Sequence, residues 1–504
     1  MPEQYSNILK LRKLGIDTHS ENIIFVRFDS QICRSEGFTA STRVVVSFEG
    51  RSIIATLNVI TSGLLQDGEA SLSEYAFERL KAREGDLITV VHLRPILSFS
   101  DVRAKMFDKK FNEHALQSII SDITKGYYSH IEIAAFVTVC SGDNLALDEV
   151  IYLTKAMINS GSMLSWPKPL IIDKHCVGGL PGNRTTPIIV PIIAAAGLTI
   201  PKTSSRAITS PAGTADVIET MTPVDLTLEQ IQDVVRKEGG CMVWGGAVKI
   251  SPADDIIIYV EKALDVDSAG QMIASVLSKK AAAGSTHTII DIPVGDTAKV
   301  RTKEEAFLLE YYFRAVGLSI GLEVEVLITD GSQPVGRGIG PALEAQDVLA
   351  VLRNEPNAPP DLRNRALKLA GLMLEIANVA PKGNGIIQAQ QLLESGEALA
   401  KFYRICDAQG GFKEPVHARL YHHVPAMSNG IVTKIDNRRL AKIAKLAGAP
   451  KSPGSGIHFK APIGSRVQLG QPLFTIYSES QGELNYALSF LNSTNDVIQI
   501  DSER

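Results

Sequence analysis

The residues with the clearest chemical potential lie in the run 174–186, which reads Lys-His-Cys-Val-Gly-Gly-Leu-Pro-Gly-Asn-Arg-Thr-Thr. The apolar residues 170–172 before it indicate a buried strand, and the apolar, alanine-rich segment 188–196 after it indicates a helix. Glycines let a backbone approach a phosphate closely, and free N–H groups at a helix start point towards it. Lys174 adds a positive charge, and the two threonines add hydroxyl donors. The run therefore predicts an anion site, although a glycine turn before a helix is by itself a weak signal.

A second stretch rich in hydroxyl groups, residues 204–214, follows another expected strand at 198–200. It reads Ser-Ser-Arg-Ala-Ile-Thr-Ser-Pro-Ala-Gly-Thr and continues into Ala-Asp-Val-Ile-Glu. In a parallel sheet, the loops that follow consecutive strands can face the same crevice. We therefore expect one phosphate to contact both loops.

The composition is that of a soluble globular protein with several hydrophobic cores, since 45% of the 504 residues are hydrophobic and 21% are charged. A net charge of -4 gives no indication of a nucleic-acid or membrane partner. The most apolar segment, 187–201, is too short to span a membrane, and residues 1–13 lack the pattern of a secretory signal. The five cysteines are far apart and lack metal-ligand spacing. We expect a cytoplasmic protein with reduced thiols and no metal.

The distribution of apolar residues predicts four domains and an α/β fold class. They are a β-rich accessory domain at 1–90, an all-α lobe at 91–165, an α/β lobe with a mainly parallel sheet at 166–415, and an α+β domain at 416–504. The accessory domain could be regulatory or purely structural. The expected strands are 23–27, 43–48, 52–57, 86–93, 241–244, 288–291, 322–328, 430–435 and 472–477. The expected helices are 71–82, 115–127, 130–140, 147–160 and 268–282, with Asn144 or Asp148 capping the fourth.

The run 173–219 resembles the pyrimidine-nucleoside phosphorylases. Their first loop reads Lys-His-Ser-x-Gly-Gly, and their long signature reads Ser-Gly/Ser-Arg-Gly/Ala, then Gly-Thr-x-Asp-x-aliphatic-Glu. The block 329–344, which begins Thr-Asp-Gly-Ser-Gln-Pro-Val-Gly-Arg and ends Ala-Leu-Glu, also resembles the family. The Pro-Gly-Asn-Arg-Thr-Thr sequence is similar to the branch of type 2 thymidine phosphorylases and archaeal AMP phosphorylases. That branch carries an extra N-terminal domain, so the resemblance covers essentially the whole chain.

The resemblance implies a two-lobed, phosphate-dependent pentosyltransferase that closes on its substrate. The first reaction it implies is that of thymidine phosphorylase, in which thymidine and phosphate give thymine and 2-deoxyribose 1-phosphate. The alternative is an AMP-type phosphorylase that gives a free base and ribose 1,5-bisphosphate. That enzyme needs a second anion site, for which Arg206 and Lys299 are candidates. Neither reaction needs a cofactor, because inorganic phosphate is a co-substrate, and we expect a homo-oligomer, either a dimer or larger.

The resemblance also assigns the site residues. Those expected to bind phosphate are Lys174, Gly179, Thr186, Ser204, Ser205, Arg206, Ala207, Ile208, Thr209, Ser210 and Thr214. Those expected to bind the nucleoside are His175, Ser275, Lys279 and Lys299, of which Ser275 and Lys279 share a helix face because they are four residues apart.

Asp267 matches the catalytic proton donor of the AMP phosphorylase branch. To act as an acid near neutral pH it needs a raised pKa, for example through burial. An ordinary helix cap before Ser268 explains Asp267 equally well. His175 could likewise be a packed loop residue instead of a base contact, and Lys174 could be a solvated surface lysine.

Three positions depart from the thymidine-cleaving enzymes. Cys176 replaces a phosphate-contacting serine, Ser210 replaces a histidine, and Val260 replaces an arginine that contacts the base. That arginine would stabilise a departing pyrimidine anion. Its absence argues against strict pyrimidine specificity and favours a mechanism in which Asp267 protonates the departing base. Two further alternatives are a magnesium-dependent phosphoribosyltransferase of the anthranilate type and a non-catalytic nucleotide-binding or assembly protein. The first loop offers Asp173 but no acidic cluster for magnesium, and two glycine loops together with Lys174 and Asp267 argue against a non-catalytic protein.

Overall fold

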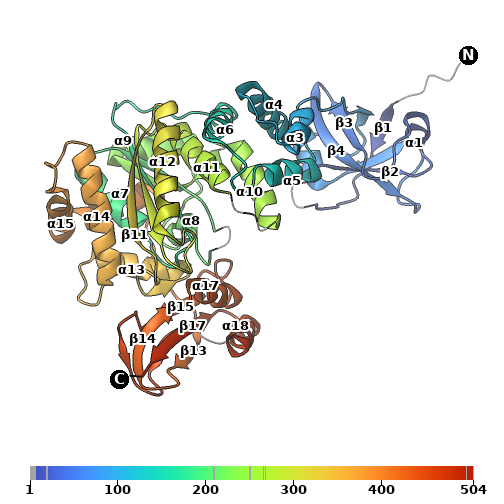
Figure 1. The fold of residues 1–504 in the computed structure, drawn as a ribbon. Coiled ribbons are helices and arrows are strands. Elements are labelled where there is room, and N and C mark those ends of the chain that lie inside the picture. The colour runs from blue at the N-terminus through green and yellow to red at the C-terminus, as the bar shows by residue number, and fades with distance from the viewer. Residues whose placement is uncertain are drawn as a thin grey trace, which may run out of the picture. The chain divides into compact units, whose positions relative to one another are not determined.

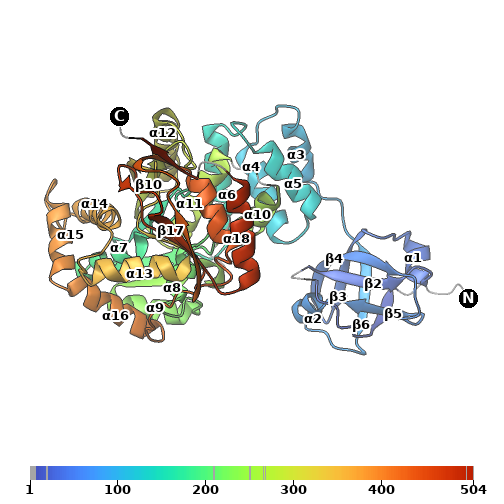
Figure 2. The same cartoon turned by 90° about the horizontal axis from the view of Figure 1, so that it is seen from below.

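The computed structural model describes residues 7–18, 21–207, 210–248, 251–264, 266, 268–494 and 497–502. The chain divides into two compact units (Figures 1 and 2). The N-terminal unit comprises Met1–Arg103 and Lys125–Glu132, and the main unit comprises Ala104–Thr124 and Ile133–Arg504.

The N-terminal unit contains a closed barrel in which the strands follow the order β1-β5-β2-β4-β3-β6. Alternating side chains such as Val44 and Val46 are fully buried and fill the barrel, as the period of two in the sequence predicts. The expected helix 71–82 is wrong at its start: Ser71 belongs to a strand, and the Ser73 hydroxyl caps the shorter helix that follows. The elements are β1 (Ile8–Leu11), β2 (Ile23–Arg27), α1 (Gln31–Glu36), β3 (Arg43–Phe48), β4 (Arg51–Ile60), β5 (Glu69–Leu72), α2 (Glu74–Leu80) and β6 (Leu87–His92).

Helices follow the barrel in the sequence: α3 (Phe99–Lys105), α4 (Glu113–Thr124), α5 (His130–Val139) and α6 (Leu147–Asn159). In the main unit, α10 (Pro252–Leu264) packs on α4 and α11 (Ala269–Ala282) packs on α6, although both come from the segment predicted as the α/β lobe. The expected cap of α6 by Asn144 or Asp148 is wrong. The N-cap is Ala146, whose N–H donates to the Glu149 carboxylate 3.0 Å away.

The main unit is built on parallel strands, which confirms the expected α/β class. β10 (His287–Val294) lies between β11 (Glu323–Asp330) and β7 (Ile172–Cys176), and β8 (Ile200–Ser204) pairs with β9 (Gly240–Trp244). A parallel bridge between Ile171 and Thr199 connects β7 to β8. The strand expected at 170–172 therefore lies further along the chain, because residues 172–176 pair with 287–291. Lys174 and His175 consequently lie in the strand itself.

Helices cover this sheet, and one of them is buried almost throughout. α7 (Thr186–Ala195) contributes Ile188, Ile189 and Ile192 to a large core, where α14 (Pro360–Ile376) and α16 (Glu397–Gln409) pack against it (Figure 2). The remaining helices are α8 (Thr214–Glu219), α9 (Leu228–Glu238), the short η1 (Gly245–Val248), α12 (Lys303–Ser319), α13 (Pro341–Leu352), α14 (Pro360–Ile376), α15 (Gly385–Glu394) and α16 (Glu397–Gln409).

The C-terminal region forms two small antiparallel sheets with two helices. One sheet has the order β12-β15-β17-β13 and the other has β16-β14-β18. Helix α17 packs on β15 and α18 packs on β17 (Figure 1). The elements are β12 (Gly338–Ile339), β13 (Leu420–Pro425), β14 (Gly430–Ile435), α17 (Asn437–Leu446), β15 (Gly456–Phe459), β16 (Arg466–Val467), β17 (Pro472–Ser478), α18 (Gln481–Ser493) and β18 (Ile498–Asp501). In the described part of the chain, every helix falls short of the length and apolarity that crossing a membrane requires.

Candidate active site

Lys174 is a buried cation in the middle of β7, two residues before the strand ends. Its side chain is almost inaccessible to solvent, so the surface-lysine alternative is wrong. The Nζ atom donates a hydrogen bond to Thr185 Oγ1 at 2.7 Å, and no ion pair among the described residues includes Lys174. Burial lowers the pKa of Lys174 below its ordinary value. A buried ammonium group whose charge no carboxylate pairs with is suited to bind an anion.

The glycine loop, residues 177–183, connects β7 to the start of α7. Gly178, Gly179 and Gly182 all have positive φ values, which side chains rarely adopt. A Cβ atom at Gly179 would lie 2.5 Å from the backbone nitrogen of Lys299, so only glycine permits this close approach. The loop therefore brings the predicted phosphate residue Gly179 against the predicted nucleoside residue Lys299.

The hydroxyl loop, residues 205–213, follows β8 and leads into α8. The Asp216 carboxylate accepts hydrogen bonds from the backbone N–H groups of Ala207 at 2.7 Å and Gly213 at 2.8 Å, which closes the loop. Ser204 is buried at the end of β8, and its Oγ has no hydrogen-bond partner among the described residues. An unsatisfied buried hydroxyl at this strand end is what a ligand-binding role predicts.

Four other predicted phosphate residues lie on the hydroxyl loop or at the starts of α7 and α8. Thr186 is buried as the first residue of α7, and Thr214 is the first residue of α8. Ser205 is exposed, and the Ser210 hydroxyl donates to Ala212 O at 3.0 Å. The predicted contacts at Ile208 and Thr209 lie outside the described residues.

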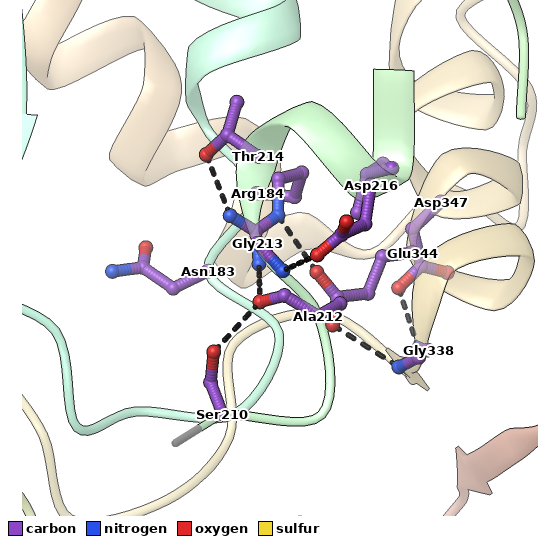
Figure 3. A network of polar contacts seen from close by, with 12 residues as sticks. Asn183, Arg184, Ser210, Ala212, Gly213, Thr214, Asp216, Gly338, Glu344 and Asp347 are labelled. Atoms are coloured by element: carbon purple, nitrogen blue, oxygen red, sulfur yellow. Dashed lines mark hydrogen bonds and ion pairs between the residues drawn. The ribbon is translucent and has the colours of Figure 1, made fainter. Parts of the chain in front are cut away.

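A network centred on Arg184 joins the two loops (Figure 3). The guanidinium donates through Nη1 to Thr214 Oγ1 at 2.7 Å, through Nη2 to Ala212 O at 3.0 Å, and through Nε to Glu344 Oε2 at 2.7 Å. Glu344 is fully buried on α13 and also accepts from Gly340 N. Burial raises the pKa of Glu344 to about 7, against the opposing attraction of Arg184. Neither residue was predicted from the sequence to have a role, although Glu344 closes the second family-like block and Arg184 lies inside the first.

Arg206 was predicted as a phosphate contact and as a candidate for a second anion site. Its guanidinium instead forms ion pairs with Glu219 at 2.8 Å and Asp216 at 3.4 Å, and it stacks over the Trp244 ring. Hydrogen bonding to Glu219 raises the pKa of Arg206 above its ordinary value. Two carboxylates therefore already compensate the charge of this guanidinium.

A buried charge cluster lies directly before Lys174. The Asp173 carboxylate contacts Lys280 Nζ at 2.7 Å and Lys202 Nζ at 3.3 Å, and all three side chains are buried. Burial opposes ionisation of Asp173, but the two ammonium groups outweigh it and the pKa lies below the ordinary value. Desolvation and the surrounding lysines hold the pKa of His175 well below 6.5, so His175 is uncharged near neutral pH.

The predicted nucleoside residues Ser275 and Lys279 lie on α11. Lys279 Nζ donates to Asp254 Oδ2 at 2.7 Å, and the Asp254 side chain on α10 is fully buried. Asp254 was not predicted from the sequence, where it is one of many acidic residues. The N-cap of α11 is Ser268; Asp267, for which a helix cap and an acid role were both predicted, lies outside the described residues.

The three departures from the family pattern have different surroundings. Cys176 Sγ accepts a hydrogen bond from Asn183 Nδ2 at 3.3 Å, and burial raises its pKa to about 12, so it is a neutral thiol. Val260 is buried on α10. Ser210 contributes its hydroxyl to the hydroxyl loop. At all three positions the chain therefore presents a group that is uncharged at neutral pH.

Comparison with known proteins places this geometry in a family. Residues 168–399 match the glycosyl transferase family a/b domain, 102–161 match its helical bundle domain, and 431–497 match the pyrimidine nucleoside phosphorylase C-terminal domain. The solved structure of anthranilate phosphoribosyltransferase from Thermus thermophilus has a TM-score of 0.52 at 18% identity, covering 61% of this chain and 98% of that chain, which indicates a shared fold.

Relatives of similar length have much higher sequence identity. A Legionella pneumophila protein named "Putative thymidine phosphorylase" is 57% identical over 97% of this chain and 95% of its own. A protein of the same name from Hahella chejuensis is 52% identical over the full length of both chains. The match to the C-terminal domain, these identities and the geometry of Lys174 and the two loops all indicate the same family. The chain therefore belongs to the pyrimidine nucleoside phosphorylase family.

Proposed function

We propose that this protein is a cytoplasmic, homo-oligomeric thymidine phosphorylase that converts thymidine and phosphate into thymine and 2-deoxyribose 1-phosphate. The observation that carries the proposal is Lys174, a buried ammonium group without an ion-pair partner among the described residues, which lies in β7 directly before the glycine loop and is hydrogen-bonded to Thr185 at the start of α7. The names of the relatives support the same reaction.

In the proposed mechanism, Lys174 and the N–H groups of both loops hold phosphate below C1′ of the nucleoside. A phosphate oxygen forms the new bond to C1′ as the bond between C1′ and the base nitrogen breaks, and the electron pair leaves with the base. Because His175 is uncharged, one of its nitrogens can donate a hydrogen bond to a base carbonyl. Asp267 would supply the proton that the departing base needs.

The second candidate is a nucleoside 5′-monophosphate phosphorylase. Val260 favours it, because this buried valine occupies the position of the arginine that would stabilise a pyrimidine anion. The ion pairs of Arg206 weaken one candidate for its second anion site and leave Lys299, which adjoins Gly179. A phosphoribosyltransferase remains a third possibility, supported at the level of fold alone.

Free-base release from a substrate panel separates these candidates. Purified protein would be incubated with thymidine, uridine, adenosine, AMP, CMP or UMP, each with and without phosphate. We expect phosphate-dependent release of thymine. Turnover of the monophosphates alone would instead assign the protein to the AMP phosphorylases. Activity that needs a diphosphate sugar donor and disappears with a chelator would support the phosphoribosyltransferase.

The proposed acid role of Asp267 predicts that Asp267→Asn lowers kcat by about 10²–10⁴-fold, the usual contribution of general acid catalysis. The KM for phosphate should change little, because the carboxyl group acts on the base and not on phosphate. Initial rates on the best substrate would measure both constants. The matched control is Asp233→Asn, which removes an exposed surface carboxylate. A full rate in Asp267→Asn on every active substrate would exclude the acid role.

A further inference from the structure

Arg184 contacts three residues from two separate segments of the chain at once. Its guanidinium reaches Glu344 on α13, the carbonyl of Ala212 in the hydroxyl loop, and the hydroxyl of Thr214 at the start of α8 (Figure 3). The side chain is 13% exposed, so these contacts are largely shielded from water. Only arginine offers several donors in a fixed planar arrangement; lysine cannot make the same three contacts. Arg184 thus ties the entrance of α7 to the hydroxyl loop.

The direction of the hydrogen bonds to Thr185 and Thr214 determines whether their hydroxyl protons can be donated to a ligand. A hydroxyl group has one proton to donate and can accept two hydrogen bonds. Thr214 Oγ1 accepts from Arg184, and Thr185 Oγ1 accepts from Lys174. Neither hydroxyl proton has an acceptor among the hydrogen bonds of the described residues. Each threonine is therefore held by a cation on one side and left with a proton to donate, which suits a phosphate oxygen as the acceptor.

Glu344 fixes the orientation of Arg184. Its Oε1 atom accepts from Gly340 N at 3.1 Å while Oε2 accepts from Arg184, so both oxygens of this buried carboxylate are used. The elements packed on α13 bring few other charges: α7 and β12 carry none, α8 carries Asp216 and Glu219, which Arg206 pairs, and β15 carries His458. Asp347, on α13 itself, accepts from the backbone of Arg337 and Gly338. Arg184 is the basic partner of Glu344.

We propose that Arg184, oriented by Glu344, is a positioning residue for phosphate: it holds the hydroxyl loop against the glycine loop and directs the Thr214 hydroxyl proton towards the bound anion. The inference rests on the proposed phosphorolysis and adds two residues for which the sequence motif gave no role. Because the guanidinium nitrogens of Arg184 are already hydrogen-bonded to Glu344, Thr214 and Ala212, the effect on phosphate passes through Thr214 and the loop instead of through a direct contact.

Steady-state kinetics with each substrate varied in turn tests this role. Arg184→Met and Arg184→Lys should each raise the KM for phosphate by about tenfold to a hundredfold, the loss expected for a charge-assisted hydrogen bond. The KM for the nucleoside should stay within about twofold, since these contacts are made to the phosphate loops. Thr214→Val should raise the KM for phosphate in the same way. Thr214→Ser keeps the hydroxyl group and should keep the wild-type KM for phosphate. Glu344→Gln should have the same effect as Arg184→Lys. Arg236→Met, at an exposed surface arginine, is the control.

A double-mutant cycle makes the test specific. If Arg184 acts through Thr214, Arg184→Met combined with Thr214→Val should raise the KM for phosphate no further than the larger single effect. Additive effects, an unchanged KM for phosphate in Arg184→Lys, or equal increases for both substrates would overturn the proposal. Calorimetric titration with inorganic phosphate, without nucleoside, tests the positioning role of Arg184 independently of the proposed reaction. Weaker phosphate binding in Arg184→Lys than in the wild type supports the positioning role whatever the nucleoside, and equal affinity contradicts it.

Discussion

Lys174→Met should remove phosphate-dependent turnover almost completely, with kcat/KM for phosphate falling by at least about 10²–10³-fold, as for the loss of one preorganised electrostatic contact. Methionine retains the length and apolar stem of lysine but not its charge. The buried ammonium group is hydrogen-bonded to Thr185 and has no ion pair among the described residues, so its charge remains available to phosphate. Initial rates with phosphate varied at saturating nucleoside would measure the effect.

Two further variants make this result interpretable. Lys168→Met removes an exposed lysine of the same unit and should leave the rates unchanged. Lys174→Arg retains the charge on a bulkier group and should retain a part of the phosphate dependence. Because Lys174 is buried, the melting temperature of each variant must also be recorded. A folded Lys174→Met protein with wild-type saturation by phosphate would remove Lys174 from the site.

The second large effect is on stability: Asp173→Asn should lower the free energy of unfolding by about 3–5 kcal/mol, as for a buried ion pair that loses one partner. The substitution keeps the size of the side chain but leaves Lys202 and Lys280 facing each other without a carboxylate. Urea unfolding followed by circular dichroism would measure the loss. Asp233→Asn, which breaks an exposed pair with Arg236, should cost less than about 1 kcal/mol.

The pH dependence of this difference follows from the lowered pKa of Asp173. A carboxyl group whose pKa is lower in the folded than in the unfolded protein stabilises the fold above its unfolded pKa, and this contribution is lost as pH falls through the folded value. The difference between the wild type and Asp173→Asn should therefore be present at pH 5 to 6 and shrink only in strong acid. A difference that disappears already between pH 6 and pH 5 would show that Asp173 is not held ionised by the two lysines.

Local patterns predicted most individual elements correctly. Strands β2, β3 and β14 have the expected bounds because alternating apolar residues satisfy both the strand period and a buried face. The errors occurred where a contact with a distant segment decided the boundary. Strand β7 extends to Cys176 because β10 pairs with it, and residues Ser71 and Leu72 belong to a strand because β2 pairs with them.

The candidate site shows the same division. The sequence identified Lys174, the glycine loop and the hydroxyl loop, because glycines, hydroxyl residues and a lysine near a helix start are themselves the signal. It could not show that Asp216 and Glu219, in the same motif, would neutralise Arg206. Residues that are close in the sequence of a loop do not necessarily contact one another. Which side chains meet depends on the path of the loop, and the packing around the loop determines that path.

By itself, then, the sequence determined the family, the parallel α/β class, four of the six barrel strands (β2, β3, β4 and β6) and the two loops proposed to hold phosphate, since local periodicity and short motifs encode all of these. Only the tertiary structure decided which charges meet: Arg184 with Glu344 across 160 residues, and Asp173 with Lys280 across 107. Such pairs have no spacing rule, because chain folding and burial bring them together. Burial also decides their chemistry, because desolvation leaves His175 uncharged and brings the pKa of Glu344 to about 7.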